Sequence, residues 1–64
     1  SGDAVEERSW YEKAAALGHA GAMFSLAQLL LDEGNIEAAR EWFERSASLG
    51  DLLAESALRD LDGE

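Results

Sequence analysis

The residues that could do chemistry are few and far apart in this sequence. His19 is the single histidine and cysteine is absent, so neither a histidine pair nor a thiolate set can hold a transition metal. The adjacent acid pairs Glu6-Glu7 and Asp32-Glu33 have no other oxygen ligands clustered beside them. We expect these carboxylates to be solvated, with weak calcium binding as the alternative.

A catalytic function is not expected from the remaining residues either. His19 lies at the start of an expected helix, which favours a structural role over a ligand or catalytic one. The six glycines form no phosphate-binding motif. A chain of 64 residues makes one small domain with little room for a catalytic cleft. We therefore expect no enzyme and no catalytic, cofactor-binding or metal-binding residue.

The charge balance restricts the partners. Fourteen acidic residues against five Lys and Arg give a net charge of −9, which repels nucleic acid and anionic membranes. No apolar run approaches the roughly 18 residues that cross a bilayer, and no segment resembles a signal peptide. Without cysteine there is no disulfide framework. We expect a cytoplasmic domain whose partner is a neutral or basic protein or peptide.

The sequence matches itself at an offset of 32 residues, which is typical of a repeat architecture. Ten of the 32 aligned positions are identical. The identical pairs are Gly2/Gly34, Arg8/Arg40, Trp10/Trp42, Glu12/Glu44, Ala15/Ala47, Leu17/Leu49, Gly18/Gly50, Ala22/Ala54, Leu26/Leu58 and Leu29/Leu61. The chain therefore contains two copies of one unit.

Each unit is predicted to contain two helices. Alanine and leucine dominate the apolar residues, and Val5 and Ile36 are the only β-branched ones, which favours helices over a sheet. Glycines follow three apolar segments at the position where a helix ends. The predicted helices are 4–17, 20–33, 36–49 and 52–62, with Asp3 (in a capping box with Glu6), Asn35 and Asp51 as N-caps. Short connections make neighbours antiparallel, so we expect an all-α fold of four helices stacked as two helical hairpins.

The helical periodicity also predicts the core. The third helix carries an apolar stripe. Ala39 and Phe43 lie in the middle of this stripe, and Trp42 lies beside it. Ala27 on the second helix is small enough to allow close approach at Ala39. The other residues expected to pack inward are Ile36, Ala47 and Leu49 on the third helix, Ala22, Met23, Leu26, Leu29 and Leu30 on the second, and Leu53, Ala54, Ala57, Leu58 and Leu61 on the fourth. Trp10 and Trp42 are expected in equivalent environments.

Two segments carry a resemblance to a known family. The sequence WYEKAA at 10–15 with LGHA at 17–20, repeated as WFERSA at 42–47 with LGD at 49–51, resembles the signature of the Sel-like repeat, a relative of the tetratricopeptide repeat. The resemblance implies a helical-hairpin solenoid over 3–62, with one complete repeat at 20–49 between two half repeats. Sel-like units usually have a longer turn than 31–35 offers. Residues 1–2 resemble a protease-cleavage remnant.

The resemblance also implies a binding surface. In these families ligands lie on the concave face of the first-type helices, which the helical spacing assigns to Phe24, Gln28 and Leu31 and, on the fourth helix, to Ser56 and Asp60. Phe24 and Leu31 share a face distinct from the one that packs inward. The alternative is that the neighbouring half repeat covers Phe24. Gln28 and Asp60 stand where relatives that grip a terminal carboxylate have basic residues, which disfavours an anionic peptide.

The two ends of the array carry charges at positions that pack inside it. Glu7 aligns with Ala39, and Arg59 aligns with Ala27. Because terminal repeats need a polar outer face, we expect half units that end the stack and a monomer, with self-association as the alternative. The expected function is a non-enzymatic protein–protein interaction module, an adaptor or docking domain that binds a peptide or partner domain. The alternative is a structural cap or self-association element of a larger repeat protein.

Overall fold

The computed structural model describes residues 2–63, with side chains from residue 6 onward, and is all-α. Its helices are α1 Gly2–Ala16, α2 Ala20–Asp32, α3 Ile36–Ser48 and α4 Leu52–Leu61, and residues 2–63 contain no strand. The predicted fold class is confirmed, and each helix end lies within two residues of its predicted place. None of the helices in this part of the chain combines the length and hydropathy needed to cross a membrane.

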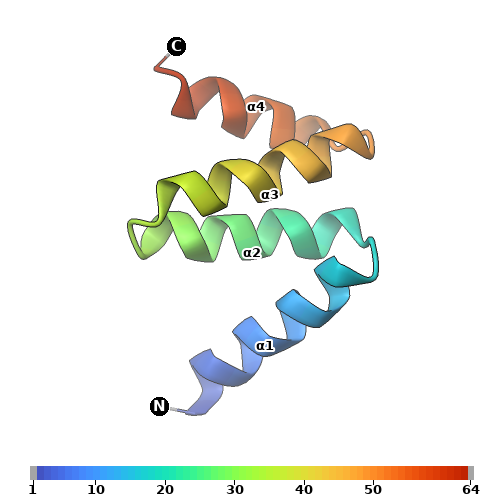
Figure 1. Cartoon of the computed structure of the whole chain (residues 1–64), viewed down its shortest axis with the longest axis vertical. Coiled ribbons are helices and arrows are strands. Elements are labelled where there is room, and N and C mark those ends of the chain that lie inside the picture. The colour runs from blue at the N-terminus through green and yellow to red at the C-terminus, as the bar shows by residue number, and fades with distance from the viewer. Residues whose placement is uncertain (1, 64) are drawn as a thin grey trace.

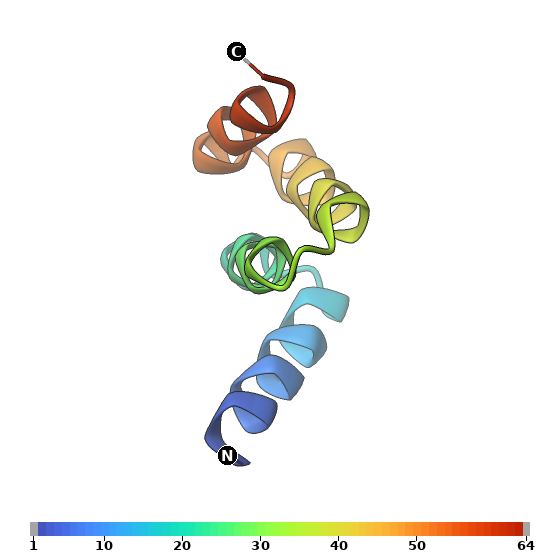
Figure 2. The same ribbon diagram turned by 90° about the vertical axis from the view of Figure 1, so that its left-hand side faces the viewer.

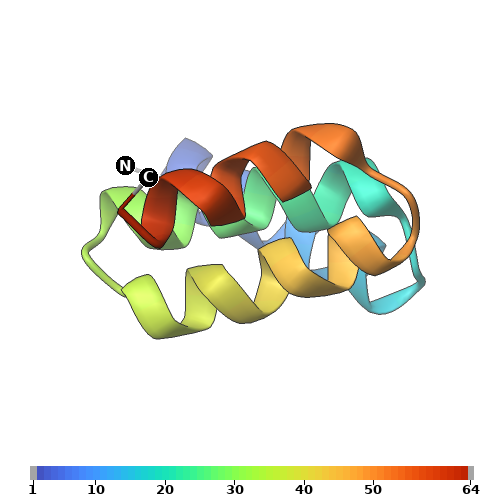
Figure 3. The same ribbon diagram turned by 90° about the horizontal axis from the view of Figure 1, so that it is seen from above.

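The helices are stacked in chain order along the longest dimension of the molecule (Figure 1), which measures 36 × 24 × 14 Å. Consecutive helices run in opposite directions, and the extensive contacts are α1–α2, α2–α3 and α3–α4. Viewed from the side, α2 and α4 lie on one side of the stack and α3 on the other (Figure 2). The view from above shows α4 over α2 with α3 displaced (Figure 3). α3 is therefore covered by helices on both sides, whereas α1 packs mainly on α2.

The same C-terminal motif ends the first three helices. At the end of α3, Gly50 N–H donates to Ala47 O at 2.9 Å and Asp51 N–H donates to Ser46 O at 3.2 Å, which is a Schellman motif. Gly18 and Gly34 make the equivalent bonds, and the three glycines have φ of +94°, +86° and +97° in chain order. Only glycine adopts this left-handed conformation without steric cost. The prediction that these glycines end helices is confirmed.

The residues predicted as N-caps differ in whether their side chains make a capping hydrogen bond. Asp51 accepts a hydrogen bond from Leu53 N–H at 3.0 Å, which confirms its capping role. Asn35 occupies the N-cap position of α3 as predicted, with a ψ of 74°, but its side chain makes no capping hydrogen bond. α1 begins at Gly2, so Asp3 lies within the helix; its side chain and the predicted capping box lie outside the described residues.

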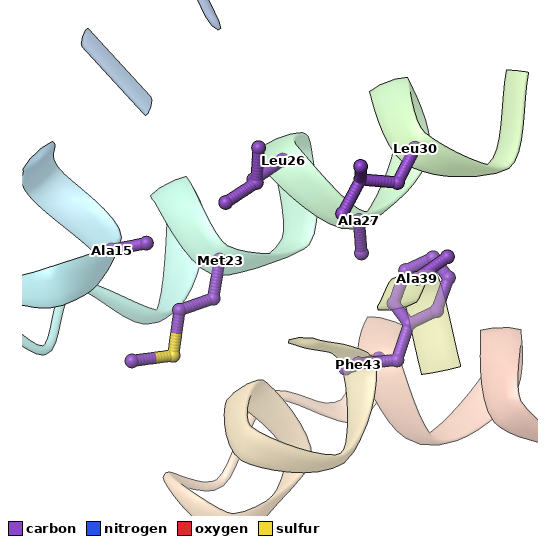
Figure 4. Close-up of a cluster of buried hydrophobic side chains, with 8 residues drawn as sticks. Ala15, Met23, Leu26, Ala27, Leu30, Ala39 and Phe43 are labelled. Atoms are coloured by element: carbon purple, nitrogen blue, oxygen red, sulfur yellow. The ribbon is translucent and has the colours of Figure 1, made fainter. Parts of the chain in front are cut away.

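The core lies between α2 and α3. Figure 4 shows Ala27 on α2 directed at α3, where Ala39 and Phe43 lie. All three are 0% exposed, and the rings of Phe24 and Phe43 pack in a T-shaped arrangement with centroids 5.5 Å apart. The predicted close approach of Ala27 and Ala39 is consistent with their complete burial. The cluster is completed by Ala15, Met23, Leu26, Leu30 and Ala54.

Three residues predicted to pack inward are instead exposed. Ile36 and Leu53 are 50% and 66% exposed. Each lies in the first turn of its helix, at an edge of the stack, where neighbouring helices give incomplete cover. Leu49, in the turn after α3, is also exposed because it is the C-cap residue and lies beyond the last helical turn.

One buried polar residue links three helices. The Ser46 hydroxyl lies 2.9 Å from Ala20 O, at the start of α2, and 2.8 Å from Asp51 Oδ2, at the start of α4. Because a hydroxyl has one proton, it donates to one of these acceptors at a time. The aligned residue in the first unit is Ala14, so the 32-residue match gave no indication of this link.

Two arginines at aligned positions bind the ends of the helices that follow them. Arg8 Nη1 lies 2.5 Å from Glu33 Oε2 at the end of α2, and Arg40 pairs with Asp62 at the end of α4. The hydrogen bond to Asp62 and its negative charge raise the pKa of the Arg40 guanidinium above its usual value. A cation beside a helix C-terminus also offsets the helix dipole. Both pairs are solvent-exposed, so each stabilises the fold only weakly.

Candidate interaction surfaces

The predicted binding face lies on α2 and α4, which share one side of the stack (Figure 3). The side chains of Gln28, Ser56 and Asp60 are exposed. Phe24 and Leu31 are half-buried and pack against the core. Phe24 is therefore both a core contact of Phe43, which lies in the same predicted repeat, and partly accessible from outside. The alternative that the neighbouring half repeat covers Phe24 stays a prediction. The predicted partner role of these five residues stays a prediction.

A second surface was not predicted. A groove of about 400 Å³ lies between α1, the following turn and α2. Its apolar surface comes from Trp10, Tyr11 and Ala14 of α1 and from Ala22 of α2. Glu7 adds a carboxylate and His19 an imidazole. Trp10 is 67% exposed. A large aromatic side chain left this accessible, beside small residues, is typical of a contact surface.

The groove corresponds to a surface that is covered inside the molecule. At the offset of 32 residues its lining aligns with Ala39, Trp42, Phe43, Ser46, Asp51 and Ala54. Four of these aligned residues, Ala39, Phe43, Ser46 and Ala54, are 0% exposed. The hydrogen bond of Ser46 to Ala20 and the contact of Phe43 with Phe24 show that α2 covers them. The groove on α1 and α2 is the uncovered counterpart of the surface on which α2 packs.

The prediction that Trp10 and Trp42 share an environment was therefore wrong. Trp42 is half-buried, packs against the core, and has the Arg45 guanidinium carbon 4.8 Å from its ring centroid. α3 has a helix on each side, whereas α1 has its extensive contact with α2 alone. The aligned positions thus differ in burial because they differ in neighbours.

The ionisable residues offer no visible reaction centre among the described residues. No group of three or more His, Asp and Glu side chains there is close enough to hold a metal ion. His19 is exposed at the N-cap position of α2, and its side chain makes no capping hydrogen bond. The groove can therefore provide apolar contact and charge.

The two end faces differ. Glu7, Glu55 and Arg59 are exposed, as expected for residues that replace Ala39, Met23 and Ala27. The first turn of α4 also exposes Leu52 and Leu53, so its outer face is polar only from Glu55 onward. The outer face of α4 was expected to be polar, and only part of it is.

The groove could have been located from the sequence by one further step. Glu7 was identified as a charge at the position of Ala39, but Trp10, on the same helix, was expected to share the environment of Trp42. The expectation that the first helix ends the stack, applied to Trp10 as well as to Glu7, would have predicted that both side chains are exposed.

Comparison with known proteins identifies no related family or structure. No protein-family model matches the sequence, and no match is found among curated proteins or among solved structures.

Proposed function

We propose that residues 3–62 form Sel-like or tetratricopeptide-like hairpins, with one complete repeat at 20–49, that act as a non-enzymatic protein–protein interaction module. As an adaptor or docking domain, the module binds a peptide or partner domain of neutral or basic character. The observation that supports this most directly is the uncovered groove between α1 and α2, where Trp10 is 67% exposed.

The shape of the ligand follows from the internal match. The aligned surface on α3 and α4 is filled by α2, a helix whose apolar face carries Met23, Leu26, Ala27 and Leu30. An amphipathic helix of this kind therefore fits the geometry of the open groove. Helix-in-groove recognition is a common mode of peptide binding.

The experiment uses a synthetic peptide of residues 19–35 as the probe, because it contains α2. Titration into the ¹⁵N-labelled chain should shift the Trp10 indole and the amides of Tyr11 and Ala22 in a saturable way. A scrambled peptide of the same composition should not. Absence of saturable shifts at millimolar peptide would contradict the proposal, as would shifts confined to Phe43 and its neighbours, which would place the peptide in α2's own site.

A matched pair of variants tests the role of Trp10. Trp10→Ala should weaken peptide binding and leave the helical circular dichroism spectrum unchanged, because the side chain is mostly exposed. Leu52→Ala removes another exposed apolar side chain, on α4 and outside the groove, and should leave binding intact. Equal effects of the two changes would show that general surface hydrophobicity causes the binding.

The alternative function is a structural cap or self-association element. Exposed Glu7 and Arg59 at positions that are alanine inside the stack favour a chain end that repels further helices. Light scattering of the isolated chain at micromolar concentration should then return the monomer mass. A stable dimer would instead make the end faces an interface between copies.

A further inference from the structure

The open groove differs from its covered counterpart at defined positions. Trp10 and Ala22 have the same residue types as their counterparts. The four residues that differ are Glu7 for Ala39, Tyr11 for Phe43, Ala14 for Ser46 and His19 for Asp51. The most consequential change is at Glu7, because it introduces a charge where the covered surface has a completely buried methyl group. A helix lying in the open groove must therefore accommodate a carboxylate.

The contacts of α2 with α3 show which ligand residue would meet that carboxylate. Ser46 contacts Ala20, and Phe43 contacts Phe24 one turn further along α2. Seven residues on from Ala20 and seven back from Ser46, two turns in each direction, the antiparallel register places Ala27 opposite Ala39. Figure 4 agrees, since Ala27 is directed at the part of α3 that contains Ala39. A ligand helix in this register presents its Ala27 position to Glu7.

The charges around Glu7 favour a cation at that position. The ion pairs formed within the described residues all involve Arg8 or Arg40, so Glu7 has no cationic partner there. Arg8, its neighbour in sequence, contacts Glu12 and Glu33 instead. An apolar ligand residue would remove water from the carboxylate without replacing its hydrogen bonds, which costs free energy. A Lys or Arg stem can cover apolar surface while its charged end reaches the carboxylate.

We infer that the α1–α2 groove selects an amphipathic helix with the apolar pattern of α2 and a Lys or Arg at the position that faces Glu7. This inference rests on the proposed function and names the chemistry of its partner. The covered groove accepts alanine at the corresponding position; the open groove takes a basic residue. The net charge of −9 adds attraction for such a helix.

The test compares three peptides of residues 19–35: the parent, Ala27→Lys and Ala27→Glu. The Lys peptide should bind the chain roughly two- to fivefold more tightly than the parent, the usual range for an exposed ion pair, and the Glu peptide should bind more weakly. The preference should shrink in 0.5 M salt because the charges are screened. Anisotropy of labelled peptides measures all three affinities.

Two protein variants make the charge assignment specific. Glu7→Lys should reverse the order of the three peptides. Glu6→Lys makes the same charge change at an exposed neighbour outside the groove and should preserve the order. Reversal by both variants would overturn the inference, because net charge alone would then explain the preference.

The failures are distinguishable. Equal affinities for the three peptides would overturn the basic-residue inference and leave groove binding standing, whereas no binding of any peptide would contradict the proposed function as well. A second copy of the chain is a competing occupant, because Arg59 on α4 aligns with Ala27. If the molar mass rises with concentration and Arg59→Glu abolishes the rise, the groove belongs to another copy and the inference is overturned.

Discussion

Replacing Phe43 by alanine should remove cooperative unfolding. Phe43 is the largest fully buried side chain, lies between α2 and α4, and contacts the Phe24 ring edge-on at 5.5 Å. Truncating a buried phenylalanine costs about 3–5 kcal/mol, which includes the loss of a ring pair worth about 0.5–1.5 kcal/mol. A domain of this size is expected to have a total stability of roughly 3–10 kcal/mol. The variant should therefore be near the limit of folding.

Thermal and urea unfolding followed by circular dichroism measures this effect. Trp10→Ala is the matched control, because it truncates an aromatic side chain that is mostly exposed and should change the free energy of unfolding by less than about 1 kcal/mol. If the Phe43→Ala curve overlays that of the parent, or if both variants lose the same stability, the core assignment between α2 and α3 is wrong.

Four further substitutions test other parts of the fold in urea unfolding. Ser46→Ala should cost about 1 kcal/mol, because it removes one donated hydrogen bond, shared between Ala20 and a partly exposed carboxylate; a neutral effect would remove its linking role. Gly18→Ala should destabilise by about 1–2 kcal/mol because φ is +94°, whereas Gly21→Ala, inside α2 with open space around the added methyl, should stabilise by about 0.5–1 kcal/mol; the same sign for both would refute the backbone argument. Phe24→Ala should keep the helical spectrum and cost roughly 1–2 kcal/mol, since the ring is half-buried; complete unfolding would exclude Phe24 from a contact surface.

Features set by neighbouring residues along the chain could be predicted from the sequence. The end of α3 depends on Gly50 and on a hydrogen bond from Asp51 to Ser46, all within six residues, so the residue types indicated it directly. The capping hydrogen bond of Asp51 also joins residues that are close in sequence, so it could be predicted in the same way. Asn35 is the exception: it occupies the N-cap position of α3 and is a residue type that often caps helices, yet its side chain makes no capping hydrogen bond.

Burial could be predicted only where both sides of a helix are covered. Phe43 and Ala39 lie between helices and were assigned correctly to the core. Trp10 and Ile36 have the same periodicity as core residues, yet one lies on a helix with a single extensive contact and the other in a first turn. A hydrophobic pattern marks the side of a helix that can be buried, and the presence of a neighbour decides whether it is.

The two ends of the stack show why the α1–α2 groove is the better binding surface. At the α4 end, Arg59 aligns with Ala27 and Glu55 aligns with Met23, so the middle of the exposed face of α4 is charged. At the α1 end, Glu7 is the one residue of the groove lining that replaces a small apolar residue by a charge, and Trp10 keeps the residue type of its half-buried counterpart Trp42. A mostly exposed tryptophan does not help a surface that faces only water. Apolar area together with a single accessible carboxylate provides affinity and selectivity in one groove.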